Sequence, residues 1–283
     1  MRPPTITGFD PATIAGRFET VSATAEMKMD RRTLIGGLTA IASVSPLLAH
    51  SGNARSAPRA RNVVLVHGLF ADGSCWSEVI PRLQAAGLNP TAVQNPLTTL
   101  AESVAAAQRA LAQQDGPTVL VGHSFSGMIV TEAGVDPKVT ALVYVAARAP
   151  DAGEDYTALA QRYPTPPASA GIVWYGDWGQ LSEAAFLRDF AGDLPPAKAR
   201  ALYAVQQPFE RRLLAGRTTQ AAWRSKPSYY AVSTDDRTIN PELERFMARR
   251  MGATTIEVKA SHLSLISQPD IITKLILQAA GHA

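Results

Sequence analysis

VLVGHSFSG, residues 119–127, is the most informative stretch of this 283-residue chain. An apolar run, a turn of small residues and a second apolar segment predict a buried strand, a tight turn and a helix. Gly122 and Ser126 are small enough for a sharp bend that would place the Ser124 hydroxyl above a sheet. The pattern G-x-S-x-G is met only in part, since Ser126 stands at the second glycine and Gly127 comes one residue late. We interpret Ser124 as a candidate nucleophile; the alternative is a loop rich in glycine and serine that happens to follow a strand.

Strand-like and helix-like segments alternate on both sides of this stretch. Short β-branched runs predict strands over residues 62–66, 91–93, 118–121, 139–145, 229–233 and 254–258. Apolar residues at helical spacing predict helices over residues 76–86, 100–112, 241–251 and 269–280, and after Ser124. Such alternation is typical of an α/β fold, with a mainly parallel sheet and helices on both faces.

Residues 151–226 interrupt this alternation. The interval is rich in proline, carries three of the four tryptophans and has helical patterns over residues 181–190 and 197–205. A long insertion between two strands of a compact sheet is usually functional. We therefore expect a helical cap over the carboxyl edge of the sheet, where ligands bind in such folds.

A serine hydroxyl needs an adjacent base, and the chain has five histidines: His50, His67, His123, His262 and His282. His50 lies in a candidate export signal, and His282 lies at the C-terminus. His123 is next to Ser124 and should point into the scaffold, and His67 ends a strand, where it would fix a loop. His262, between a strand and the last helix, is thus the candidate base; the alternative is a surface-loop histidine.

A carboxylate should orient this imidazole, and the segment after the strand at 229–233 supplies Asp235 and Asp236. Asp236 gives the chain order Ser, Asp, His. We expect Asp235 to cap the loop or face solvent. The developing oxyanion requires two donors, for which we expect the backbone N–H groups of Leu69 and Phe125.

Three segments, residues 64–76 (VLVHGLFADGSCW), 119–130 (VLVGHSFSGMIV) and 233–270, resemble the α/β-hydrolase superfamily. They look most like the compact branch that includes plant methyl esterases and hydroxynitrile lyases, and the likeness extends over residues 61–280. In that branch the aspartate precedes a short segment that ends in Pro-Glu, as Asp236 precedes Pro241-Glu242, which favours Asp236 over Asp235. The resemblance implies an α/β-hydrolase fold.

The resemblance also implies a serine esterase that cleaves small apolar carboxylic esters through an acyl-enzyme, without metal or organic cofactor. Hydroxynitrile lyases of this branch have a threonine and a lysine where this chain has Gly68 and Leu263, so ester hydrolysis is the better interpretation. A lyase, or a ligand-binding protein without catalysis on the same scaffold, is the alternative.

Substrate contacts are expected from the loop after the first strand and from the cap. Gly68 permits a close approach of that loop to the substrate. Phe70 and the cap tryptophans Trp174 and Trp178 would line an apolar acyl or alcohol pocket, although the cap aromatics could equally form the core of the cap.

Composition excludes several other classes of protein. The chain is 46% hydrophobic and 18% charged, as a globular protein is. Its net charge is +3, but it has no basic run that would follow phosphates, so nucleic acid is not an expected partner. A single cysteine, Cys75, excludes an internal disulfide and a CxxC zinc site. No apolar run reaches the roughly 18 residues of a stable membrane span.

The first 57 residues read as an N-terminal extension with an export signal, which leaves residues 58–283 as the hydrolase domain. Arg31 and Arg32 precede an uncharged stretch, residues 34–49, that is too short and too polar for a stable span. The segment resembles a twin-arginine signal and predicts a periplasmic or secreted protein. The alternative is a surface helix capped by Asp30.

Overall fold

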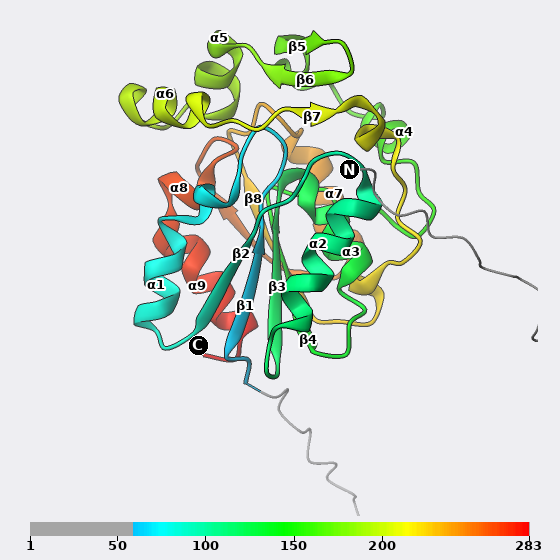
Figure 1. Ribbon diagram of the computed structural model, residues 1–283, viewed down its shortest axis with the longest axis vertical. Coiled ribbons are helices and arrows are strands. Elements are labelled where there is room, and N and C mark those ends of the chain that lie inside the picture. The colour runs from blue at the N-terminus through cyan, green and yellow to red at the C-terminus, as the bar shows by residue number, and fades with distance from the viewer. Residues whose placement is uncertain (1–58, 283) are drawn as a thin grey trace, which may run out of the picture. The chain divides into compact units, whose positions relative to one another are not determined.

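The central feature is a six-stranded parallel sheet, with strand order β2-β1-β3-β4-β8-β9. The structure is a computed structural model that describes residues 59–282 (Figure 1). The strands are β1 (Asn62–Val66), β2 (Asn89–Val93), β3 (Thr118–His123), β4 (Val139–Val145), β8 (Ser228–Ser233) and β9 (Thr254–Val258). They lie where the sequence predicts strands. The continuous apolar runs of inner strands such as β3 are buried on both faces, whereas the edge strands β2 and β9 are largely or partly exposed.

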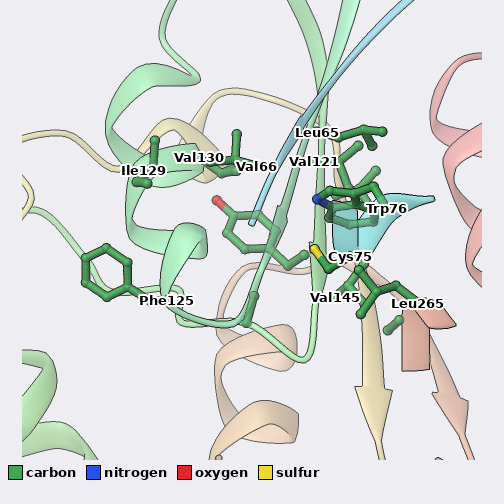
Figure 2. Packing of buried hydrophobic residues seen from close by; sticks show 14 of the residues in the cluster. Leu65, Val66, Cys75, Trp76, Val121, Phe125, Ile129, Val130, Val145 and Leu265 are labelled. Carbon is green, nitrogen blue, oxygen red and sulfur yellow. The ribbon is translucent and has the colours of Figure 1, made fainter. Parts of the chain in front are cut away.

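Helices cover both faces of this sheet (Figure 1). On one face α1 (Val79–Ala85) packs against α9 (Pro269–Ala279), and on the other α2 (Leu100–Ala112) packs against α3 (Gly127–Ala133). Further along the chain α7 (Pro241–Arg250) packs against β8, and the short α8 (Ser264–Ser267) packs against α9. The side chains of Cys75 and Trp76, just after β1, belong to the buried core with Leu65, Val121 and Leu265 (Figure 2).

The insertion between β4 and β8 lies above the carboxyl ends of the strands (Figure 1). Its helices are α4 (Tyr156–Ala160), α5 (Glu183–Ala185), a π-helical turn at Phe186–Phe190, and α6 (Pro196–Ala204). The cap is helical where the sequence predicts helices, and it also contains strands that the sequence did not predict: β5 (Ile172–Tyr175), β6 (Trp178–Leu181) and β7 (Phe209–Glu210) form a second, antiparallel sheet. Gly176, with φ +61°, makes the tight turn that pairs β5 with β6.

Among residues 59–282, no helix is long and apolar enough to cross a membrane. The predicted extension and twin-arginine-like signal, residues 1–57, lie outside the described residues.

Candidate active site

Ser124 sits at a strained turn directly after β3. Its φ is +59°, in the left-handed region that residues other than glycine seldom adopt. The Ser124 carbonyl accepts a hydrogen bond from the Arg148 N–H at 2.9 Å, which ties the turn to the segment after β4. This is the strained strand-to-helix geometry of a nucleophile elbow.

The departure from G-x-S-x-G has a physical explanation. The Ser126 hydroxyl lies 2.7 Å from the Val66 carbonyl of β1 and 2.8 Å from the His123 carbonyl, so it connects the turn to the neighbouring strand. Gly127, one residue after the second glycine position of the pattern, is required by close packing against the backbone. A Cβ atom there would lie 1.9 Å from the Arg148 carbonyl oxygen, so only glycine allows α3 to begin this close to that backbone.

Asp236 and His262 form a buried pair. Asp236 Oδ2 accepts a hydrogen bond from His262 Nδ1 at 2.5 Å, and Asp236 Oδ1 accepts the N–H groups of Thr238 at 2.6 Å and Ile239 at 3.0 Å. Because an ionised carboxylate only accepts hydrogen bonds, Nδ1 carries the proton and Nε2 is free to take another. Asp235 is exposed and faces solvent, one of the two positions expected for it.

Within the described residues, His262 Nε2 is buried without a hydrogen-bond partner. The structure therefore brings Asp236 and His262 into contact but shows no hydrogen bond from Ser124 Oγ to Nε2. Hydrogen bonds of this kind are often long or misaligned in a site without substrate and tighten when the substrate binds.

His123 has a role that the sequence did not predict. Its Nε2 lies 3.0 Å from the His262 carbonyl oxygen, and the two rings are 4.6 Å apart. Burial lowers the pKa of His123 well below its ordinary value, so the ring is neutral and Nε2–H donates to that carbonyl. His123 thus holds the backbone of the candidate base, besides pointing into the scaffold as expected.

His67 fixes the loop that carries the predicted oxyanion donor. The Asn95 N–H donates to His67 Nε2 at 2.9 Å, so Nδ1 carries the proton and donates to the Gly68 carbonyl at 2.9 Å. Burial lowers the pKa of His67. A Cβ atom at Gly68 would lie 2.6 Å from the Ser124 Cβ atom, which shows how closely the loop approaches the candidate nucleophile.

The two predicted oxyanion donors lie on either side of this contact. Leu69 follows Gly68, and Phe125 follows Ser124 at the start of a helical turn. Neither N–H donates to a loop carbonyl within the part of the chain that the structure describes. Both positions are therefore compatible with the predicted role.

A cavity of about 220 Å³ lies over Ser124. Apolar side chains make up much of its lining: Leu69, Phe70, Ile172, Phe209, Leu214 and Ile239. The polar groups that line it are Ser124, Arg148, Tyr156, Thr157, Ser169 and Thr238. The volume is below the roughly 300–1,000 Å³ of pockets for drug-sized ligands, so the cavity suits a small molecule.

The two cap tryptophans are not part of this lining, contrary to expectation. Trp174 packs against Phe209 with ring centroids 5.3 Å apart, and the Arg211 guanidinium covers its ring at 3.8 Å. Trp178 is 43% exposed. Phe209 of β7 and Ile172 of β5, which belong to the cap sheet, reach the cavity instead. Phe70 does line it, as expected.

Comparison with known proteins agrees with this architecture. The model of the alpha/beta hydrolase family matches residues 63–274. The chain belongs to the alpha/beta hydrolase family. The central sheet of six parallel strands, flanked by helices, confirms the fold that the sequence predicts.

Relatives of known name include esterases. Salicylic acid-binding protein 2 of Nicotiana tabacum is 26% identical over 78% of this chain and 97% of its own length. Methylesterase 8 of Arabidopsis thaliana is 25% identical over 78% of this chain and 89% of its own. Among solved structures, polyneuridine aldehyde esterase matches with a TM-score of 0.67 and 21% identity, over 77% of this chain and 98% of that one. The predicted resemblance to the branch of plant methyl esterases is confirmed, and the names support an ester hydrolase.

Proposed function

We propose that this hydrolase is a serine esterase that cleaves small carboxylic esters through an acyl-enzyme on Ser124. The observation that carries the proposal is the buried Asp236–His262 hydrogen bond of 2.5 Å, which leaves Nε2 of His262 unpartnered among the described residues. The His262 ring lies 4.6 Å from the ring of His123, the residue before Ser124. Relatives named as methylesterases and esterases support the same reaction class.

In the proposed mechanism, Ser124 Oγ attacks the ester carbonyl carbon while His262 Nε2 takes the hydroxyl proton. Asp236 stabilises the imidazolium that forms. The N–H groups of Leu69 and Phe125 donate to the tetrahedral oxyanion. When the carbon–oxygen bond breaks, His262 returns the proton to the departing alcohol, and the acyl group stays on Ser124. Water, activated by His262, then releases the acid.

The lyase alternative has little support at the corresponding positions. The side chain at position 263 is an apolar leucine, 1% exposed, and so supplies no ammonium group to a departing cyanide ion. Position 68 is a glycine whose Cβ atom, if present, would lie within 2.6 Å of Ser124. Release of cyanide from mandelonitrile at a rate above that of ester cleavage would favour the lyase.

The proposal is tested with methyl esters and p-nitrophenyl acetate as substrates. Ser124→Ala and His262→Ala should each abolish turnover, whereas the exposed serine variant Ser225→Ala and the C-terminal variant His282→Ala should retain it. Turnover that persists in Ser124→Ala would defeat the serine-esterase proposal.

We also propose that the protein is exported by the twin-arginine route, on the pattern of Arg31 and Arg32 before residues 34–49. The test is to locate the protein by cell fractionation and to sequence its N-terminus. Replacement of both arginines by lysine should retain the uncleaved protein in the cytoplasm, and unchanged export would contradict the proposal.

A further inference from the structure

Arg148 places a cationic side chain in the wall of the cavity that contains Ser124. Its guanidinium carbon lies 4.5 Å from the ring centroid of Tyr156 and 5.2 Å from that of Phe125. Its Nε is buried and has no hydrogen-bond partner among the described residues. Two other arginines near the cap differ, since Arg237 pairs with Asp189 at 2.7 Å and Arg250 with Glu154 at 2.8 Å.

No carboxylate of the described residues lies within 4.0 Å of Arg148, and no acidic residue lines the cavity. Aromatic faces compensate a half-buried guanidinium only in part. A buried charge without a counter-ion is unfavourable, so such charges are normally paired. Arg148 lines the cavity over Ser124, so a negatively charged group bound there could contact this cation.

The nearby acidic groups do not supply the missing negative charge. Burial raises the pKa of Tyr156 to about 12, so its phenol is neutral near neutral pH. Burial and the neighbouring Asp236 raise the pKa of Glu244 well above its ordinary value. Asp236 itself is bonded to His262 and to two backbone N–H groups.

We propose that Arg148 binds a carboxylate on the substrate, so that the preferred esters are carboxylate-bearing ones such as half-esters of small dicarboxylic acids. The inference rests on the proposed serine-esterase function and narrows its substrate class. In the reaction, one water molecule cleaves the ester bond of the half-ester, and the products are one alcohol and one dicarboxylate, with one proton released. The carboxylate that contacts Arg148 does not react.

The test compares monomethyl esters of malonate, succinate, glutarate and adipate with neutral methyl esters of equal chain length. The ratio of kcat/KM for charged over neutral ester should be about 10- to 100-fold, as for a charge-assisted bidentate contact. Arg148→Gln should remove this preference and Arg148→Lys should restore part of it, because lysine keeps the charge but not the planar fork.

The matched control is Arg211→Gln. Arg211 also stacks on an aromatic ring, that of Trp174, but it does not line the cavity over Ser124, so its replacement should leave the ratio unchanged. A wild-type ratio near one would overturn the inference. An equal loss of kcat/KM on charged and neutral esters in Arg148→Gln would also overturn the inference. It would mean that Arg148 acts on a charge that both reactions share.

A binding measurement separates this inference from the proposed function. Glutarate should bind the Ser124→Ala protein in calorimetry, and the binding should weaken about 10- to 100-fold when Arg148→Gln is added. Ester cleavage without glutarate binding or charge preference would leave the esterase proposal intact and refute the carboxylate site. Binding that depends on Arg148, without cleavage of any ester, would support the site and refute the esterase.

Discussion

The Asp193 carboxylate of the cap accepts a hydrogen bond from the backbone N–H of Ser261, the residue before His262, at 3.0 Å. It also accepts the Ser261 hydroxyl. A second contact lies nearby, where the Asp189 carbonyl accepts the Thr238 hydroxyl at 3.1 Å, two residues after Asp236. Hydrogen bonds therefore join one end of the cap to the loop that carries Asp236 and to the loop that carries His262.

Asp193→Ala should lower kcat by about 10-fold, because a loop that positions a base tolerates little displacement. The lost hydrogen bonds to a charged group should also lower the free energy of unfolding by about 1.5–3 kcal/mol. Steady-state kinetics and denaturant unfolding measure the two effects. If kcat were unchanged although the protein was destabilised, the contact would serve the cap alone and would not position His262.

His123→Asn should lower kcat with little change in KM. Asparagine is too short to keep the hydrogen bond to the His262 carbonyl, which would leave a buried acceptor unsatisfied at a cost of about 1–3 kcal/mol. The position of His262 should then vary, and the pH profile of kcat/KM should shift with it. An unaltered profile with full activity would show that the imidazole of position 123 only fills space.

Much of this site could be predicted from local sequence. Ser124 follows the fully buried strand β3, Asp236 follows the mostly buried β8, and His262 follows the largely exposed edge strand β9. The carboxyl ends of parallel strands share one edge of the sheet. The cap could not be predicted in the same way. Trp174 and Trp178 flank a turn at Gly176, and their positions depend on the pairing of β5, β6 and β7 and on packing with Phe209. Such contacts join residues far apart in the sequence and leave no local periodicity.

Ser126→Ala should lower the free energy of unfolding by about 1–3 kcal/mol, because the carbonyls of Val66 and His123 lose their shared donor in a buried site. Chemical denaturation of the variant and the wild type measures this difference. Since the turn would be held less firmly against β1, kcat should fall as well. Unchanged stability would mean that the backbone alone determines the geometry of the turn.

Glu244→Gln should stabilise the protein, and increasingly so as the pH rises. Glu244 is fully buried, its Oε2 accepts the Ser233 N–H at 3.1 Å, and burial together with Asp236 raises its pKa well above its ordinary value of 4.5. The unfolded chain ionises above that value while the folded carboxyl stays protonated. The stability contribution of Glu244 is therefore fully present below about pH 4.5 and is lost as the pH rises toward the folded pKa.

The free energy of unfolding of Glu244→Gln, relative to the wild type, should rise by up to about 1.4 kcal/mol per pH unit above about pH 4.5 and below the folded pKa of Glu244. Thermal unfolding from about pH 5 to about pH 8 measures it, because acid-sensitive groups common to both proteins cancel in the difference. Glu242→Gln, on the exposed side of the same helix, is the control and should show no such trend. A gain that is independent of pH would contradict an uncharged Glu244.

The most direct measurement is covalent labelling with a fluorophosphonate, followed by peptide mapping. We expect one adduct, on Ser124, formed rapidly by the wild type and by Ser225→Ala. Labelling should be slower by about 10³- to 10⁴-fold in Asp236→Asn, where the imidazole loses its orienting carboxylate, and absent in Ser124→Ala. A wild type that is not labelled, or whose label lies on another residue, would contradict the proposed role of Ser124.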